Sequence, residues 1–391
     1  MQPSTDALLG RLLGAVEREL PQAVQLRHRL HAEPELAHQE HGTAAAVAAA
    51  LPVAGETVAG TGLMARIGAG EAPVAVRAEL DGLPVRERTG AAFSARGETM
   101  HACGHDVHMA ALVALARAAH TLGEELPAPL LAVFQPSEEA YPSGAQELAQ
   151  GALASAAPRA VLAAHVHPAL PWGSVGLDAG AINASCDAFE IVVEGRPSHG
   201  AYPHLGRDPI LAVAEIVVAL HAQVGRRIDP LAPASLTVGV LEGGGAENVI
   251  PALARARGAL RAHRPVDRAA LRELVREVAE GVAAAHGCSA RVELTEGEPA
   301  LENDPAIVGR ARALLAAAGL RAAPEWRSCG SDDLAFLGAV APLAMAFVGL
   351  DGADGFRLRP LHHPELLPPD LAVGAVARVQ AVLYLAAAGR E

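Results

Sequence analysis

The sequence predicts an α/β protein whose main domain is interrupted by a smaller α+β domain. Short apolar runs alternate with stretches of helical periodicity over most of the chain, a pattern typical of a largely parallel sheet covered by helices. Between residues 180 and 293 the order changes to β-α-β-β-α-β, the ferredoxin-like arrangement, and the first pattern then resumes. We therefore expect residues 1–179 and 294–391 to form one domain into which 180–293 are inserted.

The first part of the main domain begins with helices and continues with buried strands. Apolar residues recur every four positions from Leu8 to Leu20, so two helices are expected within residues 5–50. Strands are predicted at 62–67, 74–80, 130–134 and 160–165, and a helix at 106–120. Because ligands gather at the carboxyl ends of strands in such sheets, polar residues that follow these runs are candidates for a functional site.

The insertion and the last segment complete the pattern. The insertion is expected to hold strands at 189–193, 235–241, 254–261 and 290–294 and helices at 208–223 and 267–284. After it, a helix, a strand and a closing helix are predicted at 305–318, 343–350 and 370–388.

The composition excludes several classes of function. The formal net charge of the 391 residues is −13 and no basic run occurs, which argues against nucleic acid and against an anionic membrane surface. All 31 positive side chains are arginine, so Schiff-base chemistry and a Walker-type lysine are excluded. The four cysteines are scattered, the first residues do not resemble a signal peptide, and the apolar stretches are interrupted short of a membrane span. These features predict a cytoplasmic protein.

A dense group of potential metal ligands lies at residues 101–108, which read His-Ala-Cys-Gly-His-Asp-Val-His. Imidazole and thiolate are the side chains that bind borderline-soft divalent metals best. Gly104 gives the backbone freedom to turn Cys103 and His105 toward one point. His101 and His108 are weaker candidates, each either a supporting or a surface residue.

Further candidates follow three other predicted elements. Glu138 and Glu139 come after one apolar strand, and their mutual repulsion is offset only if a cation lies beside them. One of the two could bind a metal while the other takes a proton from a water. His165 closes a second strand, and His362 precedes the last helix.

The ligand count favours two metal ions. Each of these side chains alone is more often a packing or surface residue, but together they form a set of five: Cys103, His105, Glu139, His165 and His362. Five ligands are too many for one tetrahedral zinc and suit two divalent metals that share a bridging ligand. Zinc, cobalt, nickel and manganese are all compatible with these donors, and the native metal stays open.

The insertion carries a polar signal of its own. His199 lies in Pro-Ser-His-Gly-Ala-Tyr-Pro, Asn248 lies in Glu-Asn-Val-Ile-Pro, and Arg261 ends a predicted strand. An imidazole, an amide and a guanidinium are what a carboxylate-bearing substrate and an oxyanion would need. Turn chemistry and a surface arginine are an equally simple reading of these residues.

Several motifs, taken in order, resemble one enzyme family. They are His-Ala-Cys-Gly-His-Asp at 101–106, Gln-Pro-Ser-Glu-Glu at 135–139, Ser-His-Gly-Ala-Tyr-Pro at 198–203, Glu-Asn-Val-Ile-Pro at 247–251 and Gly-Ser-Asp-Asp at 330–333. This set resembles the amidohydrolase branch of the dinuclear metallopeptidases related to aminoacylase, which holds bacterial aminoacylases, hippurate hydrolases and auxin-conjugate hydrolases. The resemblance implies a dinuclear-metal catalytic domain with an inserted ferredoxin-like domain that acts as a lid and dimerises.

The resemblance also implies roles for single residues. Cys103 would be shared between the metals, Glu138 would be the general base, and Asp81 would orient a ligand. His199, Asn248 and Arg261 would hold the substrate carboxylate or the oxyanion, some of them across a dimer interface.

Three positions depart from the pattern of the family. Glu79 stands where aspartate is usual, residues 140–144 replace a glycine-rich run, and Asp332-Asp333 replace a pair that usually contains glutamate. The role of Glu79 and the shape of the acyl pocket near 140–144 therefore stay open.

The function predicted on this basis is metal-dependent hydrolysis of N-acyl-L-amino acids to a carboxylate and a free amino acid. Two alternatives stay open: a dipeptidase or carboxypeptidase on the same scaffold, and a metal-binding dimer without catalysis. The second would need the metal ligands but neither Glu138 nor the residues expected to bind a carboxylate.

Overall fold

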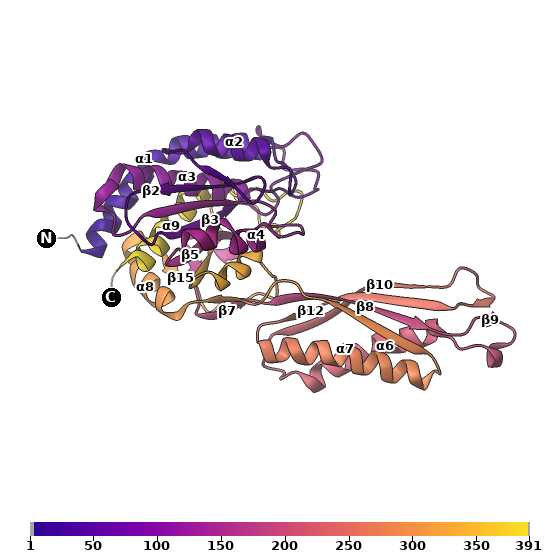
Figure 1. Ribbon diagram of the computed structural model, residues 1–391. Coiled ribbons are helices and arrows are strands. Elements are labelled where there is room, and N and C mark those ends of the chain that lie inside the picture. Colours follow the sequence, from indigo (N-terminus) through magenta and orange to yellow (C-terminus); the bar gives the residue numbers. More distant parts are fainter. Residues whose placement is uncertain (1–3, 390–391) are drawn as a thin grey trace. The chain divides into compact units, whose positions relative to one another are not determined.

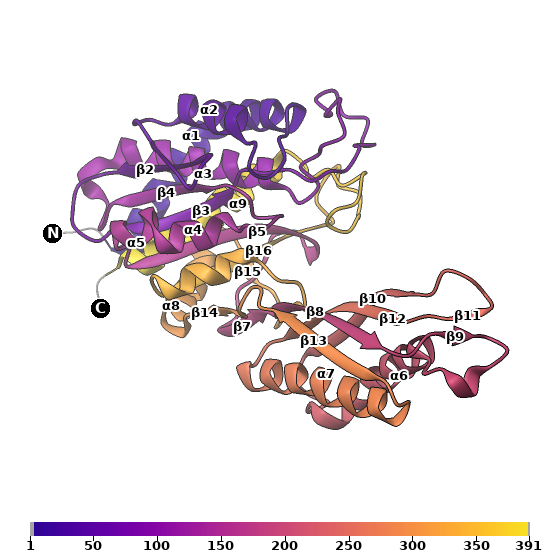
Figure 2. The ribbon, with the colours of Figure 1, turned by 45° about the vertical axis from the view of Figure 1, so that its right-hand side comes forward.

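The computed structural model describes residues 4–389, and the chain divides into two compact units (Figures 1 and 2). The main unit contains the chain up to residue 180, residues 302–326 and the chain from residue 336. The inserted unit contains 181–301 and 327–335. The predicted fold class, an α/β domain with an inserted α+β domain, is confirmed. Residues 294–301 and 327–335, expected in the main domain, cluster with the inserted unit.

An eight-stranded sheet forms the centre of the main unit, in the order β1-β2-β4-β3-β5-β16-β6-β15. Strands β4, β3, β5 and β16 run parallel to one another, whereas β2 runs antiparallel to β4 and β6 to β16. The strands are β1 (Glu56–Val58), β2 (Gly62–Ile67), β3 (Val74–Glu79), β4 (Leu130–Gln135), β5 (Ala160–Pro171), β6 (Ser174–Gly176), β15 (Arg321–Ala322) and β16 (Leu343–Asp351). Strands β7 (Gly180–Asn183) and β14 (Leu301–Asn303) form a separate pair.

Helices bury one face of this sheet. The core joins the apolar sides of α1, α3, α8 and α9 to inward side chains of β3, β4, β5 and β16. The helices are α1 (Thr5–Ala32), α2 (His41–Ala50), α3 (His105–Leu122), α4 (Gly144–Gln150), α5 (Ala152–Ala156), α8 (Pro305–Leu315) and α9 (Leu371–Ala388), with 3₁₀ turns at Gly123–Glu125, Ala316–Ala318 and Asp333–Ala339.

Local chemistry explains where several helices begin. Asp304 accepts hydrogen bonds from the N–H groups of Ala306 and Ile307, and Pro305 occupies the first helical position, where a missing N–H costs nothing. Asp208 and Pro209 begin α6 (Pro209–Arg227) in the same way. An acidic N-cap followed by proline thus sets two boundaries directly from the sequence.

The inserted unit is a four-stranded antiparallel sheet that carries two helices. Its order is β10-β12-β8-β13, and the chain order β8-α6-β10-β12-α7-β13 is the predicted β-α-β-β-α-β arrangement. The strands are β8 (Ser185–Glu194), β10 (Ala234–Gly243), β12 (Leu253–Ala262) and β13 (Ser289–Thr295), and the second helix is α7 (Pro265–Ala285). A short ribbon of β9 (Ser198–His199) and β11 (Val249–Ile250) lies beyond the sheet, with a 3₁₀ turn at Pro203–Leu205.

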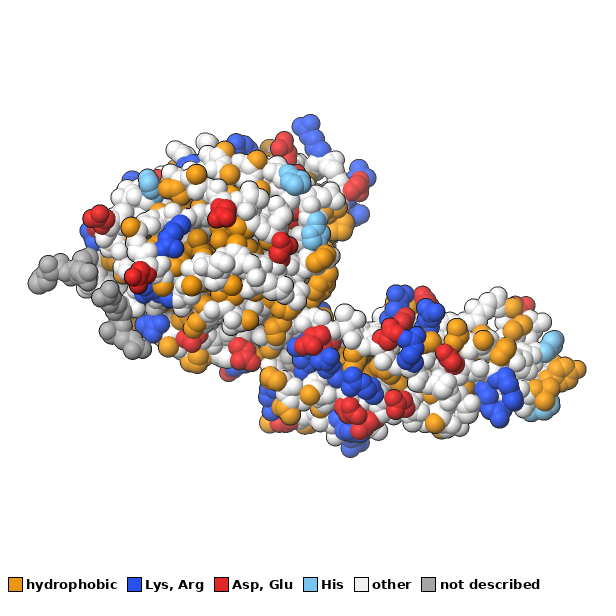
Figure 3. All heavy atoms as spheres, viewed as in Figure 1, with side chains coloured by type: hydrophobic (Ala, Val, Ile, Leu, Met, Phe, Trp, Pro, Cys, Tyr) orange, Lys and Arg blue, Asp and Glu red, His pale blue; other side chains and the backbone are white. Residues whose placement is uncertain are grey.

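Ion pairs attach α7 to this sheet. The carboxylate of Asp187, on β8, accepts from Nε and Nη2 of Arg268, the shorter contact being 2.5 Å, and Nε of Arg272 lies 3.8 Å away. Arg268 and Arg272 also pair with Glu296. Figure 3 shows arginine and acidic side chains intermixed on the visible face of this unit.

Within residues 4–389, two helices, α6 and α9, are long and apolar enough to cross a membrane, judged by length and composition alone. Each is interrupted by charge as the sequence indicates, α6 by Glu215 and α9 by Arg378. In α9, 83% of the most apolar window is buried inside the main unit, as expected of a core helix. In α6 only 28% is buried, and the buried residues face the sheet of the inserted unit.

A buried network of charges ties the first and last helices to the start of α3. Arg27 donates to Asp106 (2.9 Å), to Asp370 (2.7 Å) and to the carbonyl of Pro368 (2.5 Å). His31 lies between Asp106 (3.0 Å) and Glu87 (3.1 Å). Burial lowers the pKa of His31, but these two carboxylates outweigh burial and raise it to about 9. The ring is therefore charged at neutral pH in the folded protein.

Loss of this proton should weaken the main unit at alkaline pH. A histidine whose pKa is raised on folding stabilises the protein fully below its unfolded pKa, near 6.5, and loses that contribution as pH rises through about 9. We expect the free energy of unfolding to fall by on the order of 1–3 kcal/mol over this range in the wild type, beyond any fall in His31→Gln. Urea titrations in EDTA, followed by tryptophan fluorescence, measure this, because both tryptophans, Trp172 and Trp326, lie in the main unit. Parallel pH profiles for the two proteins would contradict the assignment.

Candidate metal centre

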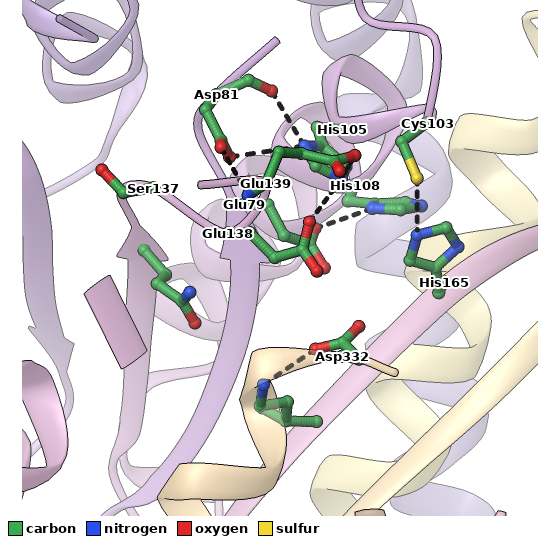
Figure 4. Close-up of polar contacts among 12 residues, drawn as sticks. Glu79, Asp81, Cys103, His105, His108, Ser137, Glu138, Glu139, His165 and Asp332 are labelled. Atoms are coloured by element: carbon green, nitrogen blue, oxygen red, sulfur yellow. Dashed lines mark hydrogen bonds and ion pairs between the residues drawn. The ribbon is translucent and has the colours of Figure 1, made fainter. Parts of the chain in front are cut away.

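Three parallel strands bring the candidate residues to one edge of the main sheet. Strands β3, β4 and β5 lie side by side, and their carboxyl ends point the same way. Asp81 follows β3, Glu138 and Glu139 follow β4, and His165 lies on β5. Figure 4 shows these side chains together with Cys103 and His105. Asp81, the paired glutamates and His165 are far apart in the chain and meet because of the order of these strands.

The turn before α3 carries the thiol and an imidazole. Gly104 has a φ of +89°, a left-handed conformation that favours glycine. A Cβ at this position would lie 2.6 Å from Cγ2 of Val166. This turn sets the Sγ of Cys103 at 3.4 Å from Nε2 of His165. The prediction that Gly104 allows Cys103 and His105 to face one region agrees with this geometry.

Asp81 fixes the orientation of His105. The Nδ1 of His105 is 2.8 Å from the carbonyl oxygen of Asp81 and 3.6 Å from its Oδ1. The other nitrogen, Nε2, then faces Glu138 Oε2 at 3.9 Å and Glu139 Oε1 at 4.0 Å. Burial lowers the pKa of His105, but Asp81 and the charges of Glu79 and Glu139 outweigh burial and raise it to about 10. A strongly negative environment thus surrounds this ring.

The loop that carries the paired glutamates is held from two sides. The N–H of Glu139 donates to Oδ2 of Asp81 at 2.9 Å. The N–H of Ser137 donates to Oε1 of Glu40 at 2.8 Å, and Glu40 also accepts from Thr61 at 2.6 Å. Glu40 is fully buried and was missed in the sequence, because its position after a polar turn carries no sign of a partner nearly 100 residues away.

His362 reaches the same edge from the loop before α9. Its Nε2 lies 3.3 Å from Oε1 of Glu139, and its N–H donates to the carbonyl of Ala102 at 2.8 Å. About half of its side chain is exposed, in contrast to the buried His105 and His165. The five predicted ligands are therefore brought together within the main unit.

The donor atoms of this cluster suit divalent cations. Cys103, His105 and Glu139 offer ligand atoms within 4.8 Å of one another. Among the residues described, the buried atoms His105 Nε2 and Glu139 Oε1 have no hydrogen-bond partner. Buried polar atoms are almost always paired, so these two indicate a missing positive partner. Burial holds the pKa of His165 well below its usual value, which leaves the neutral ring that a metal requires.

A second group of possible ligands overlaps the first. Glu79, His105, His108 and His165 also offer atoms within 4.8 Å of one another. From the sequence alone the role of Glu79 is open and His108 is a weak candidate, because the contact between them joins two different elements. The ring of His108 lies 2.7 Å from Glu79, so the two act as a pair.

The three candidates in the inserted unit do not form one cluster there. His199 and Asn248 meet on the β9–β11 ribbon, where the N–H of Gly200 donates to the carbonyl of Asn248 at 2.7 Å. Arg261 lies at the other end of the sheet, paired with Cys186 at the start of β8, and its guanidinium donates to the carbonyl of Cys329 at 2.9 Å. In the main unit, residues 140–144, which replace the glycine-rich run usual in the family, lead into α4, and the side chain of Ser143 caps this helix.

Comparisons with known proteins agree with this geometry. A model of the peptidase family M20/M25/M40 matches residues 75–383. The chain is 34% identical to an N-acetyl-L-cysteine deacetylase of Bacillus subtilis, over 92% of this chain and 86% of the relative. It is 31% identical to an N-acetyldiaminopimelate deacetylase of Bacillus licheniformis, over 94% of this chain and 98% of the relative.

A solved structure is similar over nearly the whole chain. The crystal structure of the Bacillus subtilis YXEP protein, described as a dinuclear metal binding peptidase, superposes with a TM-score of 0.83 at 28% identity. The match covers 94% of this chain and 98% of that one.

Substitution of Gly104 tests whether this turn builds the site. An alanine there is strained by the positive φ and meets Val166, so we expect Gly104→Ala to lower the free energy of unfolding by about 1–3 kcal/mol and to reduce bound metal. Gly97→Ala is the matched control, since a Cβ there meets no atom closer than 4.0 Å. Urea unfolding and elemental analysis of the purified proteins measure both effects. Equal stability and equal metal content of the two variants would show that the left-handed turn at Gly104 is not needed to build the site.

Proposed function

Because the chain belongs to peptidase family M20/M25/M40, we propose that it is a metal-dependent amidohydrolase that cleaves the amide bond of N-acyl-L-amino acids. The observation that carries this proposal is the cluster of the buried Cys103 and His105 with the partly buried Glu139, and with Glu138 beside it. The deacetylase names of two relatives support the substrate class.

The proposed ligands of two divalent metal ions are Cys103, His105, Glu139, His165 and His362. Cys103 would bridge, since its Sγ lies beside His165 and within ligand distance of the His105–Glu139 group. Such ions fit the buried Nε2 of His105 and Oε1 of Glu139, which have no hydrogen-bond partner among the described residues, and the neutral ring of His165. When bound, divalent metals supply a Lewis acid and a water of lowered pKa. Manganese, zinc, cobalt and nickel all suit this donor set.

Glu138 is the proposed general base. Its Oε2 is 3.9 Å from His105 Nε2, and its side chain is 13% exposed, so it lies beside the ligands yet stays open to water. It would take a proton from the attacking water as the water oxygen bonds to the acyl carbon. It would then deliver that proton to the amide nitrogen as the C–N bond breaks, giving a carboxylate and an amine.

Asp81 is the proposed positioning residue for both sides of the site. Its carbonyl oxygen accepts from Nδ1 of His105 at 2.8 Å, with its Oδ1 3.6 Å from the same nitrogen, and its Oδ2 accepts from the N–H of Glu139. Burial raises its pKa, but the hydrogen bonds from His105 and from the backbone outweigh burial and lower it, so the carboxylate stays ionised. A carboxylate in this position keeps the ligating nitrogen of a histidine directed at the metal.

His199 is proposed to donate to the oxyanion of the tetrahedral intermediate. Its Nδ1 accepts from the N–H of Ala201 at 3.0 Å, so the neutral ring carries its proton on Nε2. Such a donor contributes on the order of 3 kcal/mol to the transition state. Asn248, next to it on the ribbon, and Arg261 are proposed to bind the substrate carboxylate or the oxyanion.

The four-stranded sheet of the inserted unit separates His199 from Arg261 within one chain. Strand β12 runs from Leu253, beside the ribbon, to Arg261, a path of roughly 25 Å at 3.3 Å per residue. One copy therefore cannot apply both His199 and Arg261 to the same small substrate. We propose a homodimer in which two copies share each site.

Exposed features of the inserted unit support such a dimer. Strand β10 is an edge of its sheet, and its Leu241 is 55% exposed. On α6, Leu211 is 51% exposed and Val218 is 70% exposed. An open strand edge next to exposed apolar side chains is a ready template for pairing with a second copy.

Release of free α-amine from N-acyl-L-amino acids tests the function directly. A panel of acetyl, benzoyl and indole-acetyl conjugates is assayed with manganese, and the chain adds no lysine amines to the background. We expect turnover that EDTA abolishes and added metal restores. The D-enantiomer of the best conjugate and a free dipeptide of similar size are the controls. Cleavage of the dipeptide alone, by protein that holds metal, would contradict the proposal and favour a dipeptidase.

A further inference from the structure

His105 is shared by two overlapping groups of ligating side chains. One group adds Cys103 and Glu139, and the other adds Glu79, His108 and His165. Spacing alone does not separate them, because the ligand atoms of each group lie within 4.8 Å of one another. The hydrogen bonds that each side chain makes distinguish the two groups.

Both ring nitrogens of His108 are already used. Its Nε2 lies 3.0 Å from the backbone N of Val166, and a backbone N–H can only donate, so Nε2 is the acceptor. Its Nδ1 therefore carries the proton of the neutral ring and donates to Oε2 of Glu79 at 2.7 Å. No lone pair of this ring is left for a metal.

The charge of Glu79 is likewise balanced by the protein. Its Oε1 pairs with the guanidinium of Arg77, whose Nε donates to Oε1 of Gln135 at 2.8 Å. Glu79, Arg77, Gln135 and His108 are all buried residues, each at most 2% exposed. A buried carboxylate that faces an arginine and a histidine donor needs no further cation, in contrast to Glu139, whose Oε1 has no hydrogen-bond partner among the described residues.

The N–H of Val166 needs Nε2 of His108 as an acceptor because strand β3 no longer pairs with β5 at this position. The ladder between β3 and β5 stops at Arg77 and Ala163, so the β5 backbone beyond it lacks a strand partner on that side. A buried N–H without a partner is costly, and His108 supplies one. The carbonyl of Val166 in turn accepts from Nδ1 of His165 at 2.7 Å, which leaves Nε2 of His165 facing Cys103.

We propose that Glu79 and His108 are a positioning pair that binds no metal and that holds His165 in its ligating orientation through the backbone of Val166. Glu79 sets the tautomer of His108, His108 fixes the N–H of Val166, and the carbonyl of Val166 fixes the ring of His165. The pair acts on the metal site itself, so its role does not depend on which amide is cleaved.

Two substitutions at position 108 separate this role from general packing. In His108→Gln, the amide oxygen reaches the place of Nε2 and can still accept from Val166. In His108→Asn, the shorter amide reaches only the place of Nδ1, so it keeps the contact with Glu79 and loses the one with Val166. Both substitutions replace the imidazole with an amide, and each preserves one of the two contacts of His108.

The expected result is a difference in metal binding between the two variants. His108→Asn should bind cobalt(II) about 10- to 100-fold more weakly than the wild type, with an altered thiolate-to-cobalt absorption band, because His165 is released. His108→Gln should retain most of the affinity and the wild-type band. Chelator competition and absorption spectra measure both. Equal loss in the two variants, or wild-type binding in His108→Asn, would overturn the proposal.

A measurement on the wild-type protein covers the case in which His108→Asn does not fold. ¹⁵N-histidine NMR, with His108 assigned by the signal missing from His108→Gln, reports the tautomer and the ligation of each ring. We expect His108 to show a protonated Nδ1 with and without zinc, while Nε2 of His105 and of His165 shifts when zinc is added. A shift of His108 Nε2 on zinc binding would overturn the proposal.

Discussion

Negative charge gathered in a largely buried cluster at one edge of the main sheet is the constraint on which the site depends. Asp81, Glu138 and Glu139 converge there because β3 and β4 are parallel neighbours that end together. Carboxylates gathered away from water are costly unless cations or donors offset them. The protein offsets Glu79 with Arg77 and His108, but it leaves Oε1 of Glu139 and Nε2 of His105 without a hydrogen bond among the described residues. This difference marks the place of the proposed metal ions.

The rest of the main unit serves to hold that edge. Glu40 fixes the loop of the paired glutamates, Asp81 fixes His105 and Glu139, and the left-handed turn at Gly104 directs Cys103. The buried pair of Arg27 and Asp106 ties α1 to the first turn of α3, directly after His105. Because these contacts join segments far apart in the chain, the site forms only when the whole unit is folded.

The sequence was sufficient for the fold class and for the longer elements. Each predicted strand and helix has a counterpart within a few residues, because apolar periodicity over six or more residues is a strong local signal. Short strands such as β6, β7 and β15 were not predicted, since two to four residues carry no period. The extension of β5 to Pro171 was also missed, because it is stabilised by pairing with β16 rather than by its own pattern.

Site residues could be predicted from the sequence where the ends of neighbouring strands bring them together. They could not be predicted where the strand register or a histidine tautomer determines which groups meet. The five ligand candidates meet in the main unit, as the clusters of histidine, cysteine and glutamate indicated. The separation of His199 from Arg261 follows from the pairing of β12 with β8, which no local pattern reveals. The partners of His108 were equally hidden, because Glu79 and Val166 reach it from two different strands.

Comparison of Glu138→Ala with Glu139→Ala tests the central claim most directly, with metal content and turnover measured on the same samples. If Glu139 binds metal and Glu138 moves the proton, Glu138→Ala keeps two ions per chain and loses about 10²- to 10⁴-fold in rate, whereas Glu139→Ala loses metal as well. Equal loss of metal in both variants, or full activity of Glu138→Ala, would contradict the account.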